Sequence, residues 1–98
     1  MEINRQMVIE QIEKMLAGTV SCEDTGWWAF DLLMADNLLF EPGYQKLLED
    51  VIKALYHFHD IEPLMCRFYP ETEEILYFLR CLKGEEVYHR SRVVHWRV

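Results

Sequence analysis

Histidines are the first residues whose type and spacing suggest chemistry, because His57 and His59 stand two positions apart. On a helix, residues at this spacing point about 160° away from each other, so they cannot bind one metal ion together. We expect His57 on the polar face of its helix and His59 at the edge of the apolar face, hydrogen-bonded at the rim of the core. His57 is also spaced to pair with Asp60 at the end of the helix, where a protonated histidine is favoured.

The cysteines Cys22, Cys66 and Cys81 are odd in number and widely spaced, and no two of them form a C-x-x-C pair. Neither a disulfide framework nor a zinc site fits this pattern. A nucleophilic cysteine needs a histidine or a helix N-terminus beside it to favour the thiolate. Cys22 stands near a predicted helix start, but Glu23 and Asp24 follow it, and negative charges disfavour a thiolate. We therefore expect reduced thiols without metal binding or catalysis.

Neighbouring carboxylates occur at Glu23–Asp24, Glu49–Asp50 and Glu73–Glu74. Adjacent residues of a helix point about 100° apart, which is a poor geometry for a shared acid–base reaction. Each pair is therefore expected on a solvated face. The sequence also has no glycine-rich phosphate-binding loop and no G-x-S-x-G motif. It predicts a protein that is not an enzyme and that needs no cofactor or metal.

The charge of the chain is unevenly distributed. Its 98 residues carry 17 acidic side chains against 10 Lys and Arg, which gives a net charge of −7. Residues 15–45 contain no Lys or Arg but hold five acids, namely Glu23, Asp24, Asp31, Asp36 and Glu41. A surface of this kind repels a nucleic-acid backbone and attracts a basic protein. The alternative is that the net charge only keeps the protein soluble.

Four amphipathic helices must position these side chains. Apolar residues recur at helical spacing over about residues 2–17, 22–36, 43–59 and 71–83. Gly18 and Gly84 are placed to end the first and last helices, and Ser21 is placed to cap the second. Prolines suited to a first helical turn precede the third and fourth helices, at Pro42 and Pro70. The sequence predicts a single domain, residues 1–98, that is compact and all-α, with four helices packed as a bundle or as a stack of helix pairs.

The remaining segments are expected to be irregular or extended. Residues 60–69 are predicted to form a loop that packs inward through Ile61, Leu64, Met65 and Phe68. Residues 86–98 are predicted to form an extended, basic and aromatic tail, with alternation typical of a strand at Val94, Trp96 and Val98. We expect its arginines to pair with the acidic body, and contact with RNA is the alternative. Because no signal peptide or membrane-spanning run is recognised, the chain is expected in the cytoplasm, without a membrane partner.

The second helix is apolar almost all the way round. Its one polar stripe holds Asp24 and Asp31, and Trp27 and Trp28 flank that stripe. The tryptophans diverge by about 100°, so one is expected to be partly exposed beside the acids, unless both pack under neighbouring helices. Exposed aromatic residues are typical of binding hot spots. The candidate partner-binding residues are Glu23, Asp24, Trp27, Trp28, Asp31, Asp36 and Glu41; the second choice is the face of the last helix with Glu73, Tyr77 and Arg80.

Two stretches of the sequence resemble small all-helical immunity proteins of bacterial contact-dependent and polymorphic toxin systems. They are Gly18-Thr-Val-Ser-Cys-Glu-Asp-Thr-Gly-Trp-Trp-Ala and Tyr69-Pro-Glu-Thr-Glu-Glu-Ile-Leu-Tyr-Phe-Leu, the second continuing to Leu82-Lys-Gly. The resemblance covers about residues 1–84, and the tail from Glu85 onward departs from it. It implies a cytoplasmic protein that binds a cognate toxin and neutralises it by occluding the toxin's active site. Because such proteins diversify where they bind, no functional residue is carried over.

The acidic charge agrees with this resemblance. A nuclease toxin needs a basic site to hold phosphate, and an acidic inhibitor reaches such a site by electrostatically steered association. The favoured hypothesis is therefore an immunity protein with a basic nuclease toxin as its partner. The alternative is a helical homo-oligomeric or adaptor module without a toxin partner, in which the strand-like tail makes the contact.

Overall fold

The computed structural model describes residues 2–66 and 69–92. Its principal helices are α1 (Arg5–Leu16), α2 (Cys22–Leu33), α3 (Gln45–Tyr56) and α5 (Thr72–Leu82). The shorter elements are the strands β1 (Glu2–Ile3) and β2 (Leu39–Phe40), the one-turn helix α4 (Pro63–Cys66), and the 3₁₀ helices η1 (His57–His59) and η2 (Arg90–Arg92). The prediction of a mostly helical domain with four helices is confirmed. No helix of the described ranges is long and apolar enough to cross a membrane.

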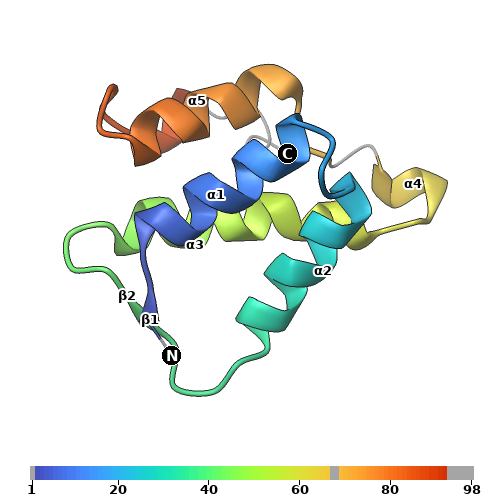
Figure 1. Cartoon of the computed structure of the whole chain (residues 1–98), viewed down its shortest axis with the longest axis horizontal. Helices are drawn as coiled ribbons and strands as arrows, with labels where there is room; N and C mark the ends of the chain where they lie inside the picture. Colours follow the sequence, from blue (N-terminus) through green and yellow to red (C-terminus); the bar gives the residue numbers. More distant parts are fainter. Residues whose placement is uncertain (1, 67–68, 93–98) are drawn as a thin grey trace.

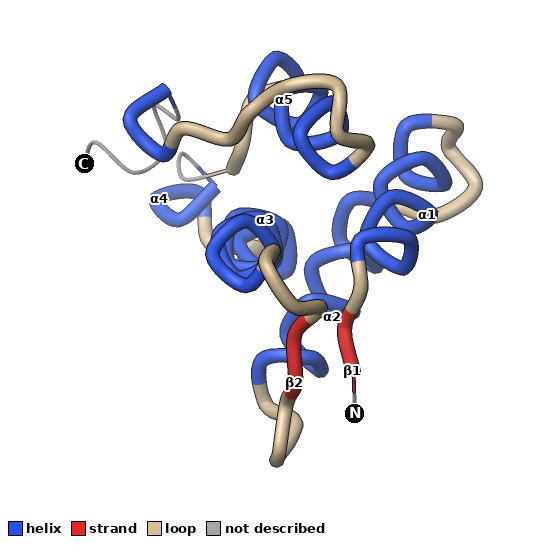
Figure 2. Tube along the Cα trace, turned by 90° about the vertical axis from the view of Figure 1, so that its left-hand side faces the viewer, coloured by secondary structure: helices blue, strands red, loops and turns tan. Residues whose placement is uncertain are grey.

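Helix α3 lies at the centre of the molecule (Figure 1). Figure 2 looks along the axis of α3 and shows α1, α2 and α5 arranged around it. The apolar face of α3 supplies much of the core, as its helical periodicity predicts. The fully buried apolar side chains of the core are Ile3, Val8, Ile12, Ala29, Leu48, Val51, Ile52, Ala54, Leu55 and Phe78.

The N-terminal residues pair as a strand, contrary to the prediction that the first helix begins near residue 2. Helix α1 begins only at Arg5, because the side chain of Asn4 accepts a hydrogen bond from the backbone N–H of Met7 and caps the helix there. Residues 2–3 then pair in parallel with residues 39–40, and the backbone N–H of Glu41 donates to the carbonyl of Ile3 (2.8 Å). This pairing ties the start of the chain to the segment that leads into α3.

Two expectations about the connecting segments are wrong. Pro42 does not begin a helix, because Gly43 has a φ of +86° and α3 starts only at Gln45. Residues 60–69 contain the short helix α4, and Ile61 and Leu64 are 77% and 76% exposed rather than packed inward. The side chain of Met65 and the whole of Phe68 lie outside the described residues.

The described part of the tail folds back over α3 and α5. It includes the 3₁₀ turn η2, so the prediction of a wholly extended tail is wrong, and the alternation at Val94, Trp96 and Val98 lies outside the described residues. We call the residues that hold this segment the tail clamp: Asp50, Tyr77, Arg80, Glu86, Tyr88, Arg90 and Arg92. Arg90 pairs with Asp50 of α3, as predicted for tail and body, whereas Arg92 pairs with Glu86 of the tail itself and Arg97 lies outside the described residues.

Asp50 anchors the tail clamp from within α3. Its side chain is only 1% exposed, whereas the sequence suggested a solvated Glu49–Asp50 pair. Tyr88 donates a hydrogen bond from Oη to Asp50 Oδ2 (2.5 Å), and Arg90 Nε lies 3.6 Å from the same oxygen. Lys46, at the predicted i,i+4 spacing, reaches the other oxygen at 3.6 Å. Glu74 is buried as well, so the Glu73–Glu74 pair is not fully solvated either.

Tyr77 of α5 and Glu86, which follows α5 in the chain, complete the tail clamp. Glu86 accepts hydrogen bonds from Arg80 Nε (2.8 Å) and Arg92 Nη1 (2.9 Å), and the bond from Arg80 is the main cause that lowers the pKa of Glu86. Tyr77 donates from Oη to the carbonyl of Val87 (3.2 Å) and accepts from the backbone N–H of His89 (2.8 Å). Burial raises the pKa of Tyr77. The hydroxyl is thus tied to the tail backbone on both sides.

Candidate functional site

Helix α2 begins where the sequence predicts. Ser21 Oγ accepts a hydrogen bond from the backbone N–H of Asp24 (2.9 Å), which satisfies one of the free donors of the first turn. Glu23 and Asp24 lie in that turn, where the helix dipole favours negative charge. Trp27 and Asp31 follow Glu23 at intervals of four residues and therefore share its side of the helix. We call Glu23, Asp24, Trp27 and Asp31 the α2 face, and all four residues are exposed.

The two tryptophans of α2 have different environments. Trp27 is 46% exposed, whereas Trp28 is half-buried and packs against the core. Of the two alternatives that the sequence left open, one exposed tryptophan or two packed ones, the structure shows the first, and the exposed one is Trp27. Trp28 therefore lies among the structural residues, so we leave it out of the candidate surface.

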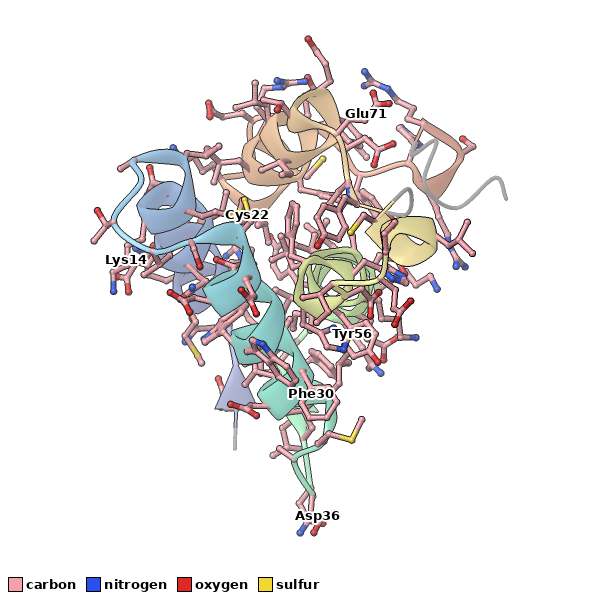
Figure 3. The ribbon with its side chains drawn as sticks, turned by 90° about the vertical axis from the view of Figure 1, so that its right-hand side faces the viewer. Lys14, Cys22, Phe30, Asp36, Tyr56 and Glu71 are labelled. Atoms are coloured by element: carbon pink, nitrogen blue, oxygen red, sulfur yellow. The ribbon has the colours of Figure 1, made fainter. Side chains whose placement is uncertain are left out.

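Phe30, Tyr56 and His59 form an aromatic cluster, and two of these rings, Phe30 and His59, contact Trp27. Its indole meets the ring of Phe30 at 5.4 Å and the imidazole of His59 at 5.0 Å between centroids, both in edge-to-face geometry. Tyr56 completes the cluster, 4.3 Å from His59 and 6.0 Å from Phe30. Phe30 of α2 and Tyr56 of α3 lie side by side in Figure 3. Trp27 is thus an exposed ring that rests on other rings rather than a freely rotating side chain.

Gly26 holds α2 against η1 directly beside Trp27. A Cβ atom at this position would lie 2.1 Å from the backbone nitrogen of His59 and 2.5 Å from the carbonyl carbon of Phe58. Only glycine allows two backbones to approach this closely. The contact fixes the distance between α2 and η1, and it therefore places His59 under the indole of Trp27.

The two histidines of η1 are held in place by polar contacts. Both histidines reach the carboxylate of Asp60, His57 through Nδ1 (3.2 Å) and His59 through Nε2 (3.5 Å). Tyr69 donates its hydroxyl to the carbonyl of Asp60, and interaction with the Cys66 thiol, followed by burial, raises the pKa of Tyr69 to about 12. The predicted pair of His57 and Asp60 is confirmed. The expected divergence of His57 and His59 does not prevent them from sharing one carboxylate, because they lie on a 3₁₀ turn rather than in α3.

The acids of the α2 face differ from the four acids of the described residues that pair with Lys or Arg side chains, and they share the lack of an ion pair with other exposed acids such as Glu10 and Glu85. Elsewhere Lys or Arg side chains pair with Glu13, Glu41, Asp50 and Glu86. Among residues 2–66 and 69–92, no ion pair reaches Glu23, Asp24 or Asp31. The α2 face therefore keeps its negative charge directed at solvent.

Asp36 and Glu41, the other two acids of the predicted set, are not part of the α2 face. Asp36 is exposed, but it lies beyond the end of α2, at the lower tip of the molecule in Figure 3, whereas Cys22 lies at the other end of α2. Glu41 forms an ion pair with Arg5 Nε (2.8 Å), and a hydrogen bond from the backbone N–H of Arg5 lowers the pKa of Glu41. The charge of Glu41 is thus used within the fold.

Other features of the described residues are less suited to a site. An open cavity of about 570 Å³ lies between the start of α1 and the end of α5, where Arg5 and Glu41 line it and pair with each other. No group of three or more His, Cys, Asp or Glu residues in the described ranges is placed to hold a metal ion. The three cysteines are free thiols. Tyr77, named with the second-choice surface, is buried in the tail clamp.

Phe30, Tyr56 and His59 are the functional candidates that sequence reasoning missed. Each has an apolar or rim position on its own helix, and only the packing of α2 on η1 brings them under Trp27. The one signal in the sequence is Gly26, because a glycine inside a helical pattern often marks a close backbone approach.

Comparison with known protein families, characterised proteins and solved structures finds no match to this chain. Function must therefore be argued from the surface itself. The most distinctive surface of the described chain is the α2 face, an exposed tryptophan with three acids around it, fixed in place by the aromatic cluster.

Proposed function

We propose that this chain is an immunity-type binding protein that neutralises a basic bacterial toxin by covering the toxin's active site with the α2 face. The observation that carries the proposal is the combination of Trp27, exposed and supported by other rings, with acids that have no ion pair in the described chain. Carboxylates that a fold does not pair internally remain available to a partner. We place this partnership in the bacterial cytoplasm.

Electrostatics favours a basic partner. The chain carries a net charge of −7, and residues 15–45 contain no cation to offset Glu23, Asp24 and Asp31. Complementary charge accelerates encounter and excludes like-charged competitors, while contributing less to the lifetime of a complex. A toxin that grips phosphate has the required positive site.

Trp27 adds an apolar contact to the α2 face, which its charges alone do not provide. Binding hot spots are enriched in tryptophan, because a large ring buries much apolar area at a small entropic cost. Phe30 and His59 already restrict the indole in the free protein, so docking loses little further side-chain freedom. The α2 face thus combines long-range attraction with a short-range anchor.

A second function, an adaptor or homo-oligomeric module, has one observation in its favour. Ile61 and Leu64 are largely exposed on and just before α4, and such apolar side chains suit a protein contact. The described part of the tail is bound to Asp50 and Tyr77 of the same chain, and the strand-like residues predicted to make the contact, Val94, Trp96 and Val98, lie outside the described residues. We rank this function second because the apolar positions carry no charge pattern that selects a partner.

The test is co-expression with the product of the gene immediately upstream, which the proposal expects to contain a toxic domain. The wild-type chain should protect growth, and Asp24→Lys/Asp31→Lys should not, while its helical circular dichroism stays intact. The matched control is Glu71→Lys/Glu73→Lys on α5, which changes net charge equally at exposed acids and also alters a first helical turn. Full protection by the α2 variant, or the lack of any toxin gene upstream, would contradict the proposal; loss of protection in the control alone would move the interface to α5.

A further inference from the structure

We propose that the partner places an arginine guanidinium, rather than a lysine ammonium, over Trp27 between the acids of the α2 face. This inference rests on the proposed function and specifies the chemistry of the residue that docks. It follows from a recognition unit that recurs within the described residues: an arginine stacked on an aromatic ring and paired with a carboxylate.

The first unit joins α1 to the turn before α3. The guanidinium carbon of Arg5 lies 3.8 Å from the ring centroid of Tyr44. Arg5 Nε is 2.8 Å from Glu41 Oε2. The ring attracts the flat face of the cation while the carboxylate accepts from its edge, and these two contacts do not compete for the same atoms.

The second unit belongs to the tail clamp. The guanidinium carbon of Arg92 lies 4.4 Å from the ring centroid of Tyr77, and Arg92 Nη1 is 2.9 Å from Glu86 Oε2. Arg80 reaches the same carboxylate at 2.8 Å. In both units the cation is an arginine, and no lysine of the described residues is held over a ring in this way.

The α2 face has the ring and the carboxylates of this unit. Glu23 and Asp31 lie four residues before and after Trp27, so one carboxylate is available on each side of the indole along the helix. Within the described residues, no Lys or Arg pairs with either acid or stacks on the indole. The component that is missing is the cation, and the partner must bring it.

The geometry favours arginine over lysine. A guanidinium is planar and weakly hydrated, so it can stack on an indole and still donate hydrogen bonds at its edge, whereas an ammonium keeps its hydration shell more strongly. Tryptophan is the best of the aromatic rings for a cation. Phe30 and His59 hold the indole from the protein side, so the remaining exposed surface is the part that a partner can reach.

The experiment uses the full chain, labelled with ¹⁵N, and two blocked heptapeptides that differ only in carrying three arginines or three lysines. The indole N–H resonance of Trp27, assigned with Trp27→Phe, is followed in titrations at equal ionic strength. We expect the arginine peptide to shift this resonance with an affinity at least about threefold higher than that of the lysine peptide. Asp24→Asn/Asp31→Asn should weaken both peptides, and the control Glu71→Gln/Glu73→Gln should weaken them less.

Equal affinities for the two peptides would overturn the inference, as would an arginine preference that persists in Trp27→Leu, where binding is followed by the backbone amide resonances of residues 23–31. If the peptides bind equally but Asp24→Asn/Asp31→Asn weakens both, the arginine inference fails and the proposed acidic docking surface stands. If neither the acids nor Trp27 affects binding, both proposals fail together.

Discussion

The α2 face and the tail clamp both contain aromatic rings and carboxylates, but the carboxylates of the two regions differ in their ion pairs. In the tail clamp, Asp50 and Glu86 each meet two cations of the chain. On the α2 face, no ion pair within the described ranges reaches Glu23, Asp24 or Asp31. The first region uses charge to fix a segment of the chain, and under the proposed function the second presents its charge to a partner.

Burial explains why the two regions differ in this way. A buried carboxylate such as Asp50 must be paired and hydrogen-bonded, because desolvation of a lone charge costs several kcal/mol, on the order of the stability of a small domain. An exposed acid such as Asp31 has no such requirement. Substitutions in the tail clamp should therefore change the stability of the fold, whereas substitutions on the α2 face should change binding.

The largest expected effect comes from Gly26→Ala, which forces α2 away from η1. The new methyl group would meet backbone atoms of Phe58 and His59, which cannot move aside as a side chain can. We expect a loss of about 3 kcal/mol in the free energy of unfolding, measured by urea denaturation, and a change in the Trp27 indole resonance. The control Gly43→Ala meets open space but has a φ of +86°, so it should lose only about 1 kcal/mol. A wild-type stability for Gly26→Ala would contradict the close approach of the two backbones.

The next effect separates the two regions directly. Asp50→Ala should lower the free energy of unfolding by about 2 kcal/mol, because it leaves the hydroxyl of Tyr88 and two cations without their shared acceptor. Asp31→Ala should change it by less than about 0.5 kcal/mol, because this acid is exposed and its charge is not used in the fold. Equal losses in the two variants would mean that the α2 face is also structural.

Tyr88→Phe tests the same anchor with a smaller change. The ring stays, and only the hydrogen bond from Oη to Asp50 is lost, so we expect a cost of about 1 kcal/mol in the free energy of unfolding. The double variant with Asp50→Ala should cost less than the sum of the two single variants, because both remove one interaction. Strict additivity would show that Tyr88 and Asp50 do not act together.

The smallest effect is a pH dependence in the tail clamp. Arg80 lowers the pKa of Glu86 in the folded protein below its ordinary value near 4.5. Its stabilising contribution is therefore complete above that ordinary value and is lost as the pH falls through the lowered folded pKa. Glu86→Gln should melt at a lower temperature than wild type at pH 7, and this difference should vanish in strong acid. A constant gap between Glu86→Gln and wild type at all pH values would contradict the assignment.

The sequence predicted the parts of the fold that local rules control. Helical periodicity and the cap at Ser21 located α2, whereas the divergence of Trp27 and Trp28 left open whether one ring is exposed or both are packed. The pairing of residues 2–3 with residues 39–40 could not be predicted, because a two-residue strand leaves no periodic pattern.

The candidate site was only partly predictable for the same physical reason. The acids of α2 are local features, but the exposure of Trp27 and the support from His59 depend on packing against η1, more than thirty residues away. The sequence predicted that Asp50 is solvated, because its i,i+4 spacing to Lys46 is typical of a surface pair. The structure buries Asp50 under the tail, where Tyr88, 38 residues later in the chain, donates a hydrogen bond to it.

The most direct test of the central claim is to map the surface of this chain that contacts the purified product of the neighbouring upstream gene, which the proposal expects to contain a toxin domain, inactivated by mutation. Backbone and indole resonances of the ¹⁵N-labelled full chain would be followed as the unlabelled domain is added. We predict that residues 23–31 and the indole of Trp27 shift or broaden first, and that the tail clamp around Tyr88 and Asp50 stays unchanged. Perturbations centred on the tail clamp or on α5, with the α2 face unaffected, would contradict the claim that the unpaired acids of α2 form the docking surface.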